Sequence, residues 1–460
     1  MRFAVPLRLA AGAALLALLA SCAAVPAPEP VASAPPPAAP APRPPAPTPS
    51  LVSAPFRLDA EPAFDIGLAV DRETLTVAPV TSATLSWRAP DGEKSAEVSG
   101  PVRLRVSGAQ VLVEPMGQAR AVPLAVLESR DTLWVGDASF ERGESARLAF
   151  NGSHWRGRFK VFLGPRGKLA LATRLPLERY LQGVVPGEIG ALRDSLLEAG
   201  RAQAIAARSY SLFYRGRRAS EGFDLFATVE DQLYSPTEAE KPLATRCVET
   251  TRGQVSLFGD APIRANYCST CGGVTADVWE AWPTDSRGYL VSVADRDRDR
   301  DGDGGDHCAL SPQYRWRESW PVEQFAATIA RFAPPQNVPL PAAGIGEIRD
   351  VRVEARSHSG RVWRLRIETS TGPVVIPAYS LRQVLRRPGA GQPILRSTLF
   401  KIAVRRDASG HPVEVVASGA GSGHGVGLCQ TGALAMAREG ARAGEILSHY
   451  YRGTEVKRLY

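Results

Sequence analysis

The sequence predicts an α+β fold, because strand-like and helix-like periodicities both occur without regular alternation. Between residues 56 and 167, apolar and polar residues alternate in short segments that are separated by Gly, Pro and Asp turns. A long alanine-rich segment with a helical period follows, and further short strands and helices complete the chain. Strands mixed with a few helices, rather than strict βαβ alternation, indicate mixed β-rich domains.

The N-terminus has the composition of an export signal. Two arginines precede an apolar stretch over residues 9–20, which is too short to span a bilayer. The motif Leu19-Ala20-Ser21-Cys22 resembles a bacterial lipobox, which implies removal of residues 1–21 and acylation of Cys22. An ordinary signal peptide with a chance cysteine is the alternative. We therefore expect an exported protein that a lipid anchors to the membrane, facing the periplasm or cell wall. Ala23 replaces the aspartate linked to inner-membrane retention, which favours the outer membrane.

Two regions precede the long helix. Residues 22–55 are dominated by Pro and Ala, so they lack the apolar side chains of a core and lean toward an extended tether or a disordered spacer. Residues 56–165 form the predicted N-terminal β-rich region. Its clearest strands are Phe64–Val70, Val102–Val106, Val111–Val113 and Phe159–Leu163.

Residues 166–460 form the second predicted region, which mixes helices and strands. The long helix covers Arg193–Tyr214, contains many alanines and no proline, and has a plausible stop at Gly216. The other predicted helices are Val322–Phe332, Gly432–Arg438 and Ala443–Tyr451, and the predicted strands are Ile348–Glu354, Val362–Glu368 and Lys401–Arg405.

Glu188 is the candidate catalytic residue. Pro186-Gly187 predicts a turn, which would hold Glu188 on a short connection before the alanine-rich helix. Its neighbours Val185 and Ile189 favour desolvation, which raises the pKa of a carboxyl group, whereas a nearby helix N-terminus would lower it. Judged on these residues alone, a solvated turn glutamate or a charge at a helix start is the alternative.

The order of several motifs resembles the stage II sporulation protein D family, which includes amidase enhancers. The motifs are Val184–Ile189, Ala202–Tyr210, Cys271–Gly273, Tyr289–Val293, Ser311–Trp316, Leu395–Phe400 and Gly423–Ala433. The resemblance implies a lytic transglycosylase that cleaves peptidoglycan glycan strands lacking stem peptides, with Glu188 as its catalytic residue. A single carboxylate suffices for this reaction, because the C6 hydroxyl of the muramic acid attacks internally and gives a 1,6-anhydro product.

Five further polar or aromatic residues are candidates for substrate binding. Gln203, Arg208 and Tyr210 lie on the predicted long helix, and His424 and Gln430 belong to the glycine-rich motif near the C-terminus. Each also has a structural interpretation: a solvent-facing or capping side chain for Gln203 and Arg208, a core position for Tyr210, and a tight turn for His424.

The cysteines predict either a metal site or a disulfide, and no cofactor is required for the reaction. Cys268, Cys271, His307 and Cys308 supply four nitrogen and sulfur ligands of the tetrahedral zinc type. In an exported protein a disulfide such as Cys271–Cys308 is equally open. The acidic segment Asp297–Asp303 imitates the start of a calcium loop but lacks the final acidic ligand, so we interpret it as a solvated loop.

The expected partners follow from export and charge. The formal net charge of +8 favours a polyanion, and export excludes nucleic acid in favour of peptidoglycan glycan strands. The membrane, through the lipid anchor, and a cell-wall amidase are further expected partners. Two other functions stay open at this point: a non-catalytic glycan-binding activator of an amidase, and a lipoprotein that only scaffolds other wall proteins.

Overall fold

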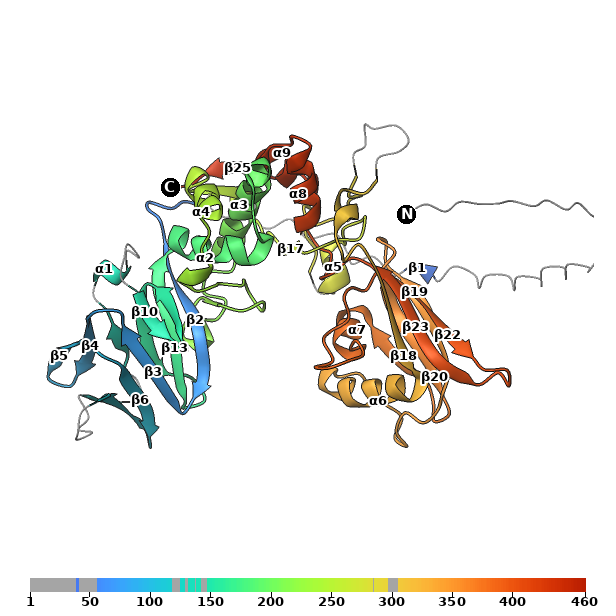
Figure 1. Ribbon diagram of the computed structural model, residues 1–460, viewed down its shortest axis with the longest axis horizontal. Helices are drawn as coiled ribbons and strands as arrows, with labels where there is room; N and C mark the ends of the chain where they lie inside the picture. The colour runs from blue at the N-terminus through green and yellow to red at the C-terminus, as the bar shows by residue number, and fades with distance from the viewer. Residues whose placement is uncertain are drawn as a thin grey trace, which may run out of the picture. The chain divides into compact units, whose positions relative to one another are not determined.

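The computed structural model describes residues 39–40, 56–117, 125–128, 131–136, 138–141, 147–283, 285–296 and 305–460 (Figure 1). The signal peptide, Cys22, nearly all of the tether and the acidic segment Asp297–Asp303 lie outside these residues, so their interpretations stay predictions. Within the described ranges, no helix has both the length and the apolar character needed to cross a membrane.

Two β-sheets form the N-terminal part of the described chain and share one apolar core. The alternation predicted from the sequence is present: in β6 the side chains of Val102 and Leu104 are buried, whereas Arg103 between them is exposed. The first sheet contains, in spatial order, β14 (Leu225–Phe226), β2 (Ala63–Arg72), β13 (Leu169–Pro176), β12 (Arg158–Leu163), β9 (Leu133–Val135), β4 (Ala83–Ala89) and β5 (Gly92–Val98). The second contains β11 (Ser153–Arg156), β10 (Arg147–Phe150), β3 (Thr74–Pro79), β6 (Val102–Ser107), β7 (Gln110–Pro115) and β8 (Ala125–Leu127), and helix α1 (Ala138–Glu141) contacts β12 and β13.

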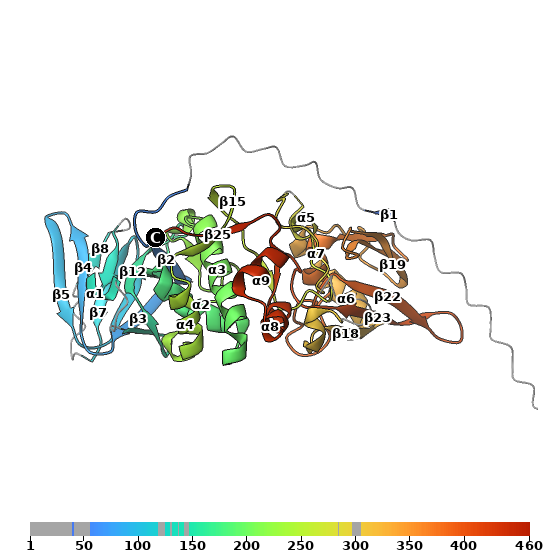
Figure 2. The same ribbon diagram turned by 90° about the horizontal axis from the view of Figure 1, so that it is seen from above.

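A second core lies around helix α3 (Leu197–Phe213). Its alanines are all buried, and their small side chains let neighbouring helices approach closely. Figure 2 shows α2 and α4 beside α3. The helices that contact α3 are α2 (Leu177–Ile189), α4 (Pro242–Thr250), α8 (Gln430–Arg438) and α9 (Ala443–Tyr450). The short strands of this region are β15 (Gln254–Phe258), β16 (Ala261–Pro262), β25 (Glu455–Arg458) and the parallel pair β17 (Tyr267–Cys268) and β24 (Leu428–Cys429). Its short helical turns are α5 (Val278–Ala281), η1 (Asp194–Leu196), η2 (Ala219–Glu221), η3 (Thr237–Ala239) and η4 (His307–Leu310).

A third core lies between residues 316 and 417, where two sheets pack with two helices. Trp320 is fully buried there, and its ring packs against Phe325 of α6. One sheet has the order β18 (Arg315–Pro321), β23 (Pro412–Ala420) and β22 (Phe400–Arg406). The other has the order β1 (Ala39–Pro40), β19 (Ile348–Arg356), β20 (Val362–Thr369) and β21 (Val374–Pro377), and the helical elements are α6 (Val322–Phe332), α7 (Ala378–Val384) and the 3₁₀ turn η5 (Pro334–Gln336).

The predicted α+β class is confirmed, with strands dominant and few helices. The predicted helix Val322–Phe332 matches α6 residue for residue, because prolines border it on both sides. The long alanine-rich helix starts later than predicted, at Leu197, because residues 194–196 form a separate 3₁₀ turn.

The predicted turn at Pro186-Gly187 is wrong. Helix α2 continues through both residues to Ile189 and ends at Gly190, which has a positive φ of 77°. Tertiary packing overrides the local signal: a Cβ on Gly183 would lie 2.5 Å from the Tyr234 ring and one on Gly187 would lie 3.1 Å from the Leu233 carbonyl oxygen. The two glycines therefore let α2 pack tightly against residues 233–235, and Glu188 lies in its last turn.

Candidate active site

Two donors from distant parts of the chain hold the carboxylate of Glu188. The backbone N–H of Leu233 donates to Oε1 at 2.9 Å, and Nε2 of Gln430 donates to Oε2 at 3.4 Å. Gln430 is the first residue of α8, and its Nε2 also lies 3.4 Å from Oε1 of the fully buried Gln203 on α3. Helices α2, α3 and α8 thus meet at this carboxylate.

Burial raises the pKa of Glu188 above the usual range of a glutamic acid. Hydrogen bonds from Leu233, Gln430 and the Tyr267 side chain favour the anion and offset only part of this rise. Among the described residues no cation forms an ion pair with Glu188, so nothing charged opposes the effect of burial. A carboxyl group whose pKa moves toward neutrality suits a general acid.

Glu188 opens onto a cavity of ≈ 350 Å³, a size that accommodates part of a sugar chain. Aromatic rings, charged groups and backbone from several separate segments surround it. The lining residues are Glu188, Tyr210, Tyr214, Arg217, Val229, Glu230, Asp231, Arg264, Asn266, Tyr267, Cys268, Ser269, Trp282, Gly423, His424 and Gln430.

The other two carboxylates of the lining are already paired with arginines. Asp231 is buried between Arg217, at 3.0 Å, and Arg218, at 3.0 Å, and it also accepts the backbone N–H of Phe226. Glu230 is largely exposed and lies 3.5 Å from Arg218. Glu188 is therefore the carboxyl group of this cavity that geometry leaves available for proton transfer.

The structure brings Tyr210, His424 and Gln430 together with Glu188 on one cavity, although they are far apart in sequence. Gln203 lies behind this lining and reaches Glu188 only through Gln430. Its Nε2 has no hydrogen-bond partner among the described residues. Gln203 is thus placed to orient Gln430 rather than to touch a ligand.

Arg208 does not line the cavity. Its guanidinium is fully buried and makes a bidentate ion pair with Glu178, at 2.8 and 2.7 Å, and it donates to the carbonyls of Gln254 and Val248. These bonds join α2, α3, α4 and β15. The expectation that Arg208 orients Glu188 or binds sugar is therefore replaced by a role in packing, because its donors are occupied elsewhere.

His424 lines the cavity but also closes a tight turn. Its Nδ1 accepts the backbone N–H of Val426 at 3.0 Å, and its ring packs 5.1 Å from the ring of Trp282. Burial lowers the pKa of His424 to about 3, and the positive charges of Arg382 and Arg264 act in the same direction. The imidazole is therefore neutral at physiological pH and suits a structural or hydrogen-bonding role.

Several lining residues escape prediction from the sequence. Tyr267, Arg264 and Trp282 come from a loop-rich segment without helical or strand periodicity, and the Leu233 contact uses a backbone N–H. The guanidinium of Arg264 lies over the Trp282 ring at 4.1 Å. No local pattern marks these residues, because only the folded chain brings them to Glu188.

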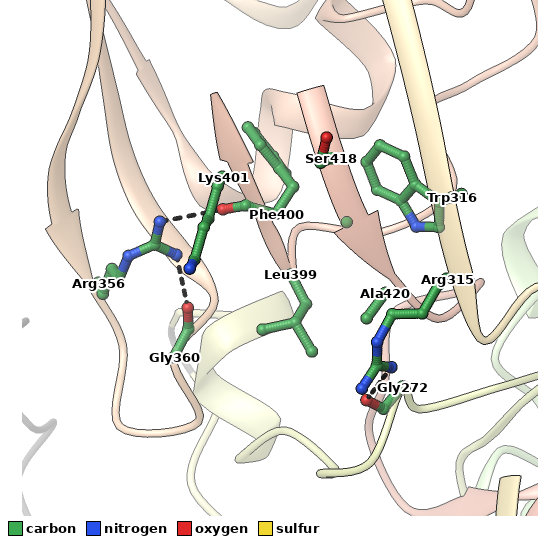
Figure 3. A pocket seen from close by; sticks show the side chains of 11 residues that line it. Gly272, Arg315, Trp316, Arg356, Gly360, Leu399, Phe400, Lys401, Ser418 and Ala420 are labelled. Carbon is green, nitrogen blue, oxygen red and sulfur yellow. Dashed lines mark hydrogen bonds between the residues drawn. The ribbon is translucent and has the colours of Figure 1, made fainter. Parts of the chain in front are cut away.

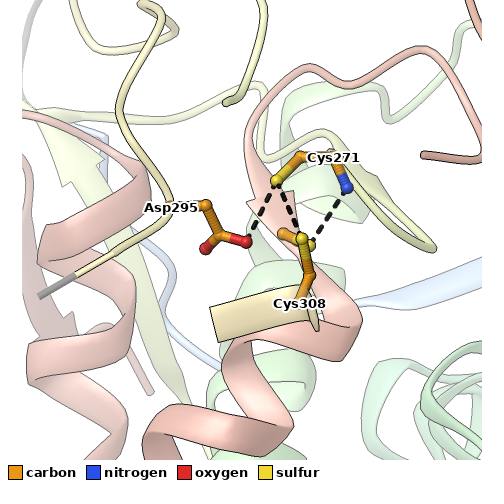
Figure 4. Close-up of side chains that lie close together, drawn as sticks. Cys271, Asp295 and Cys308 are labelled. Carbon is orange, nitrogen blue, oxygen red and sulfur yellow. Dashed lines mark hydrogen bonds between the residues drawn. The ribbon is translucent and has the colours of Figure 1, made fainter. Parts of the chain in front are cut away.

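The cysteines form a cluster that differs from the predicted ligand set (Figure 4). Cys271 and Cys308 lie together, but their partners are Asp295 and Cys429 rather than Cys268 and His307. The Sγ atoms of Cys271 and Cys308 are 3.7 Å apart, so the alternative disulfide is not formed in this structure. His307 instead faces Glu439 at 3.5 Å, and Cys268 lines the Glu188 cavity.

A second cavity, of ≈ 530 Å³, lies where the sheet of β18, β23 and β22 meets the Gly272 and Gly360 loops (Figure 3). Arg315, Arg356 and Lys401 give it a positive character, and Arg356 donates to the carbonyls of Gly360 and Phe400. Its lining, as far as the structure describes it, contains no carboxylate for acid catalysis. The Glu188 cavity is therefore the candidate active site.

Comparison with known proteins identifies relatives of this chain. A family model described as "Stage II sporulation protein" matches residues 165–258, and one described as a domain of unknown function matches residues 300–427. The first match contains α2, Glu188 and α3, which supports the resemblance seen in the motifs.

Three curated relatives align with about 60–67% of the chain. An uncharacterized protein of Brachyspira hyodysenteriae is 25% identical over 310 residues, which cover 67% of this chain and 74% of that protein. Stage II sporulation protein D of Bacillus subtilis is 26% identical over 297 residues, covering 61% of this chain and 74% of the relative. The amidase enhancer of Bacillus subtilis is 28% identical over 305 residues, covering 60% of this chain and 40% of the relative. Residues 165–258 therefore match a stage II sporulation protein domain, and the chain is similar to stage II sporulation protein D and to an amidase enhancer.

Proposed function

We propose that this protein acts on the cell wall as a lytic transglycosylase, which cleaves the bond between N-acetylmuramic acid and N-acetylglucosamine in peptide-stripped glycan strands. Its similarity to stage II sporulation protein D and to an amidase enhancer supports a cell-wall function. The observation that carries the enzymatic proposal is the environment of Glu188. Burial raises the pKa of its carboxyl group, no cation among the described residues pairs with it, and it lies on a cavity lined by aromatic rings.

Glu188 serves as acid and then as base in this mechanism. Protonated Glu188 donates its proton to the glycosidic oxygen while the bond from that oxygen to C1 of the muramic acid breaks. The C6 hydroxyl of the same sugar forms the new bond to C1, and its proton passes to the Glu188 carboxylate. Glu188 is protonated again, no water is consumed, and the products are a 1,6-anhydro end and a free 4-hydroxyl.

One carboxyl group is enough because the nucleophile belongs to the substrate. Hydrolysing glycosidases generally place a second carboxylate across the sugar to act as nucleophile or to activate water. Asp231, the buried carboxylate of the same cavity, is held between two arginines and is not free for that role. The geometry therefore favours internal attack over hydrolysis.

We propose that two arginines of the cavity lining give it a preference for strands without stem peptides. Once the peptide is removed, the lactyl group of each muramic acid ends in a free carboxylate. Arg217 and Arg264 line the cavity close to Tyr210 and Trp282, and each already pairs with one carboxylate, Asp231 and Asp285 respectively. We propose that the remaining donors of these two arginines select the peptide-stripped strand.

A non-catalytic role as activator of a cell-wall amidase is the second candidate, and the amidase enhancer among the relatives favours it.

Both candidate functions require the protein to act outside the cytoplasm. We propose that acylated Cys22 anchors it to the membrane, with the outer membrane favoured, so that the folded region reaches the glycan strands.

Product analysis separates the two candidates. The purified protein is incubated with peptide-stripped glycan strands, and the strand ends are identified by mass spectrometry. A transglycosylase produces 1,6-anhydro ends without added amidase. An activator produces no anhydro ends and instead accelerates an added amidase on intact peptidoglycan, which would overturn the enzymatic proposal.

A further inference from the structure

A buried cluster of ligand-type side chains lies beside the Glu188 site. Cys271, Asp295, Cys308 and Cys429 come from four separate segments, and one ligand atom of each lies within 4.8 Å of the others. All four residues are buried. Figure 4 shows that the side chains of Cys271, Asp295 and Cys308 point toward one another. Polar thiol and carboxyl groups are rarely gathered in a core without a partner that satisfies them.

The spacing of the sulfur atoms fits a tetrahedral metal. A zinc ion with Zn–S bonds of about 2.3 Å separates its sulfur ligands by roughly 3.8 Å. The Cys271 and Cys308 Sγ atoms are 3.7 Å apart, and Cys271 Sγ lies 3.0 Å from Oδ2 of Asp295. We propose that Cys271, Cys308, Cys429 and Asp295 bind one divalent metal ion, and that this ion is zinc.

The surroundings hold these ligands in place without the metal. The hydroxyl of Tyr450 on α9 donates to Oδ1 of Asp295 at 2.6 Å, which leaves Oδ2 directed at the three sulfur atoms. The backbone N–H of Cys271 donates to Sγ of Cys429 at 3.2 Å, a bond that favours a thiolate. Hydrogen bonds that orient the ligands in this way are typical of built metal sites.

The donor set favours zinc over harder cations. Thiolates are soft ligands that select zinc, copper(I) or iron–sulfur clusters, whereas calcium and magnesium prefer oxygen. Three sulfurs and one oxygen close a four-coordinate site, as in structural zinc centres, and leave no position for substrate. The ion therefore has a structural role and takes no part in the cleavage.

One proposed zinc ligand is the chain neighbour of a residue that contacts Glu188. Cys429 directly precedes Gln430, whose side chain donates to Glu188. The effect of the metal on catalysis that follows from this adjacency rests on the proposed function. A metal that binds Cys429 to Cys271, Asp295 and Cys308 would fix the start of α8 and hence the Gln430 donor. Gln430 would then be a positioning residue whose own position depends on the metal.

Metal analysis of the purified full-length protein tests the site. Wild type should contain about one zinc per chain, as expected for a single structural site. Cys271→Ser and Cys308→Ser should lose the zinc, whereas Cys247→Ser, which changes a buried cysteine outside the cluster, should retain it. Glu188→Gln should also retain the zinc. The zinc content therefore tests the metal site even if the proposed transglycosylase activity is not found.

X-ray absorption at the zinc edge of the wild type gives an answer even where a cysteine variant fails to fold. The proposal predicts three sulfur ligands at about 2.3 Å and one oxygen at about 2.0–2.2 Å. A metal-free wild type after zinc loading, a Cys271–Cys308 disulfide shown by intact mass, or a ligand shell with nitrogen in place of sulfur would overturn it.

Discussion

The two ends of helix α2 carry two glutamates with opposite properties: Glu178 is buried, and Glu188 is half-buried at the edge of the cavity. Near its start, Glu178 faces the Arg208 guanidinium at 2.8 and 2.7 Å and also accepts the Tyr460 hydroxyl at 2.6 Å. Near its end, Glu188 accepts hydrogen bonds from neutral donors alone, as far as the structure describes the chain. Burial acts to raise the pKa of both carboxyl groups. At Glu178 the hydrogen bonds and the charge of Arg208 outweigh this effect, so the net pKa is lowered. At Glu188 burial prevails, and the pKa is raised.

This difference shows that burial alone does not make a carboxyl group an acid catalyst. A cation within hydrogen-bond distance turns a desolvated glutamate into a structural anion, and without one the carboxyl group keeps its proton to a higher pH than an exposed glutamic acid does. The same helix therefore has one end that stabilises the fold and one end that is suited to chemistry.

The largest expected effect on stability comes from a substitution at Glu178, near the start of α2. Glu178→Gln leaves the Arg208 charge buried without a partner and should lower the free energy of unfolding by about 3–5 kcal/mol. Because the pKa of Glu178 is lowered in the folded state, its contribution is present above the usual carboxyl pKa and is lost as the pH falls through the lowered value. Urea unfolding at neutral and acidic pH measures both.

A matched double variant sharpens this result. Glu178→Gln combined with Arg208→Met removes both charges, so it should recover part of the lost stability. A double variant that is less stable than the single one would contradict the ion-pair interpretation.

The sequence predicts parts of this molecule better than others, and the reason differs from residue to residue. Helix α6 is predicted to the residue because prolines delimit it, and the β2, β6 and β12 strands follow from alternation. The end of α2 is mispredicted because the Pro186-Gly187 signal is local, whereas the packing of Gly183 that overrides it involves Tyr234 and Ser235, about 50 positions away in the sequence.

The candidate site shows the same limit. Glu188 and Gln430 are recognisable from motifs, but the Leu233 N–H, Tyr267 and Trp282 reach the cavity only through tertiary contacts. The cysteine cluster is half predicted for the same reason: Cys271 and Cys308 stand out by spacing, whereas Asp295 and Cys429 join them only in the folded chain.

The next largest expected effect is a loss of activity from a substitution beside Glu188, at the end of α2. Gln430→Leu removes a donor to the Glu188 carboxylate and should reduce kcat/KM by roughly 10–100-fold, the range for one lost charge-assisted hydrogen bond of about 1.5–3 kcal/mol. Loss of this donor also raises the pKa of Glu188 further. The alkaline limb of the pH–rate profile should therefore move to higher pH, and a limb that moves to lower pH would argue against the Glu188 assignment.

A smaller effect tests the raised pKa itself. Because the folded state binds the Glu188 proton more tightly than the unfolded state, ionised Glu188 destabilises the fold at pH values above its raised pKa. Glu188→Gln should therefore increase the Tm slightly at alkaline pH, by less than Glu178→Gln decreases it. The gain should vanish below the usual carboxyl pKa, and a destabilised variant at alkaline pH would contradict the comparison.

The smallest effect is expected for the exposed carboxylate of the cavity. Glu230→Gln changes a largely exposed group that pairs loosely with Arg218, so its free energy of unfolding should stay within about 0.5 kcal/mol of wild type. Its turnover of glycan strands should also be close to wild type. A large loss of turnover would assign Glu230 a share in the chemistry.

The most direct test of the central claim compares Glu188→Gln with wild type and Glu230→Gln on peptide-stripped glycan strands, with 1,6-anhydro ends counted by mass spectrometry. We expect wild type and Glu230→Gln to produce anhydro ends, and Glu188→Gln to produce none although it unfolds at a temperature close to that of wild type. Anhydro ends formed by Glu188→Gln at the wild-type rate would exclude Glu188 as the catalytic acid.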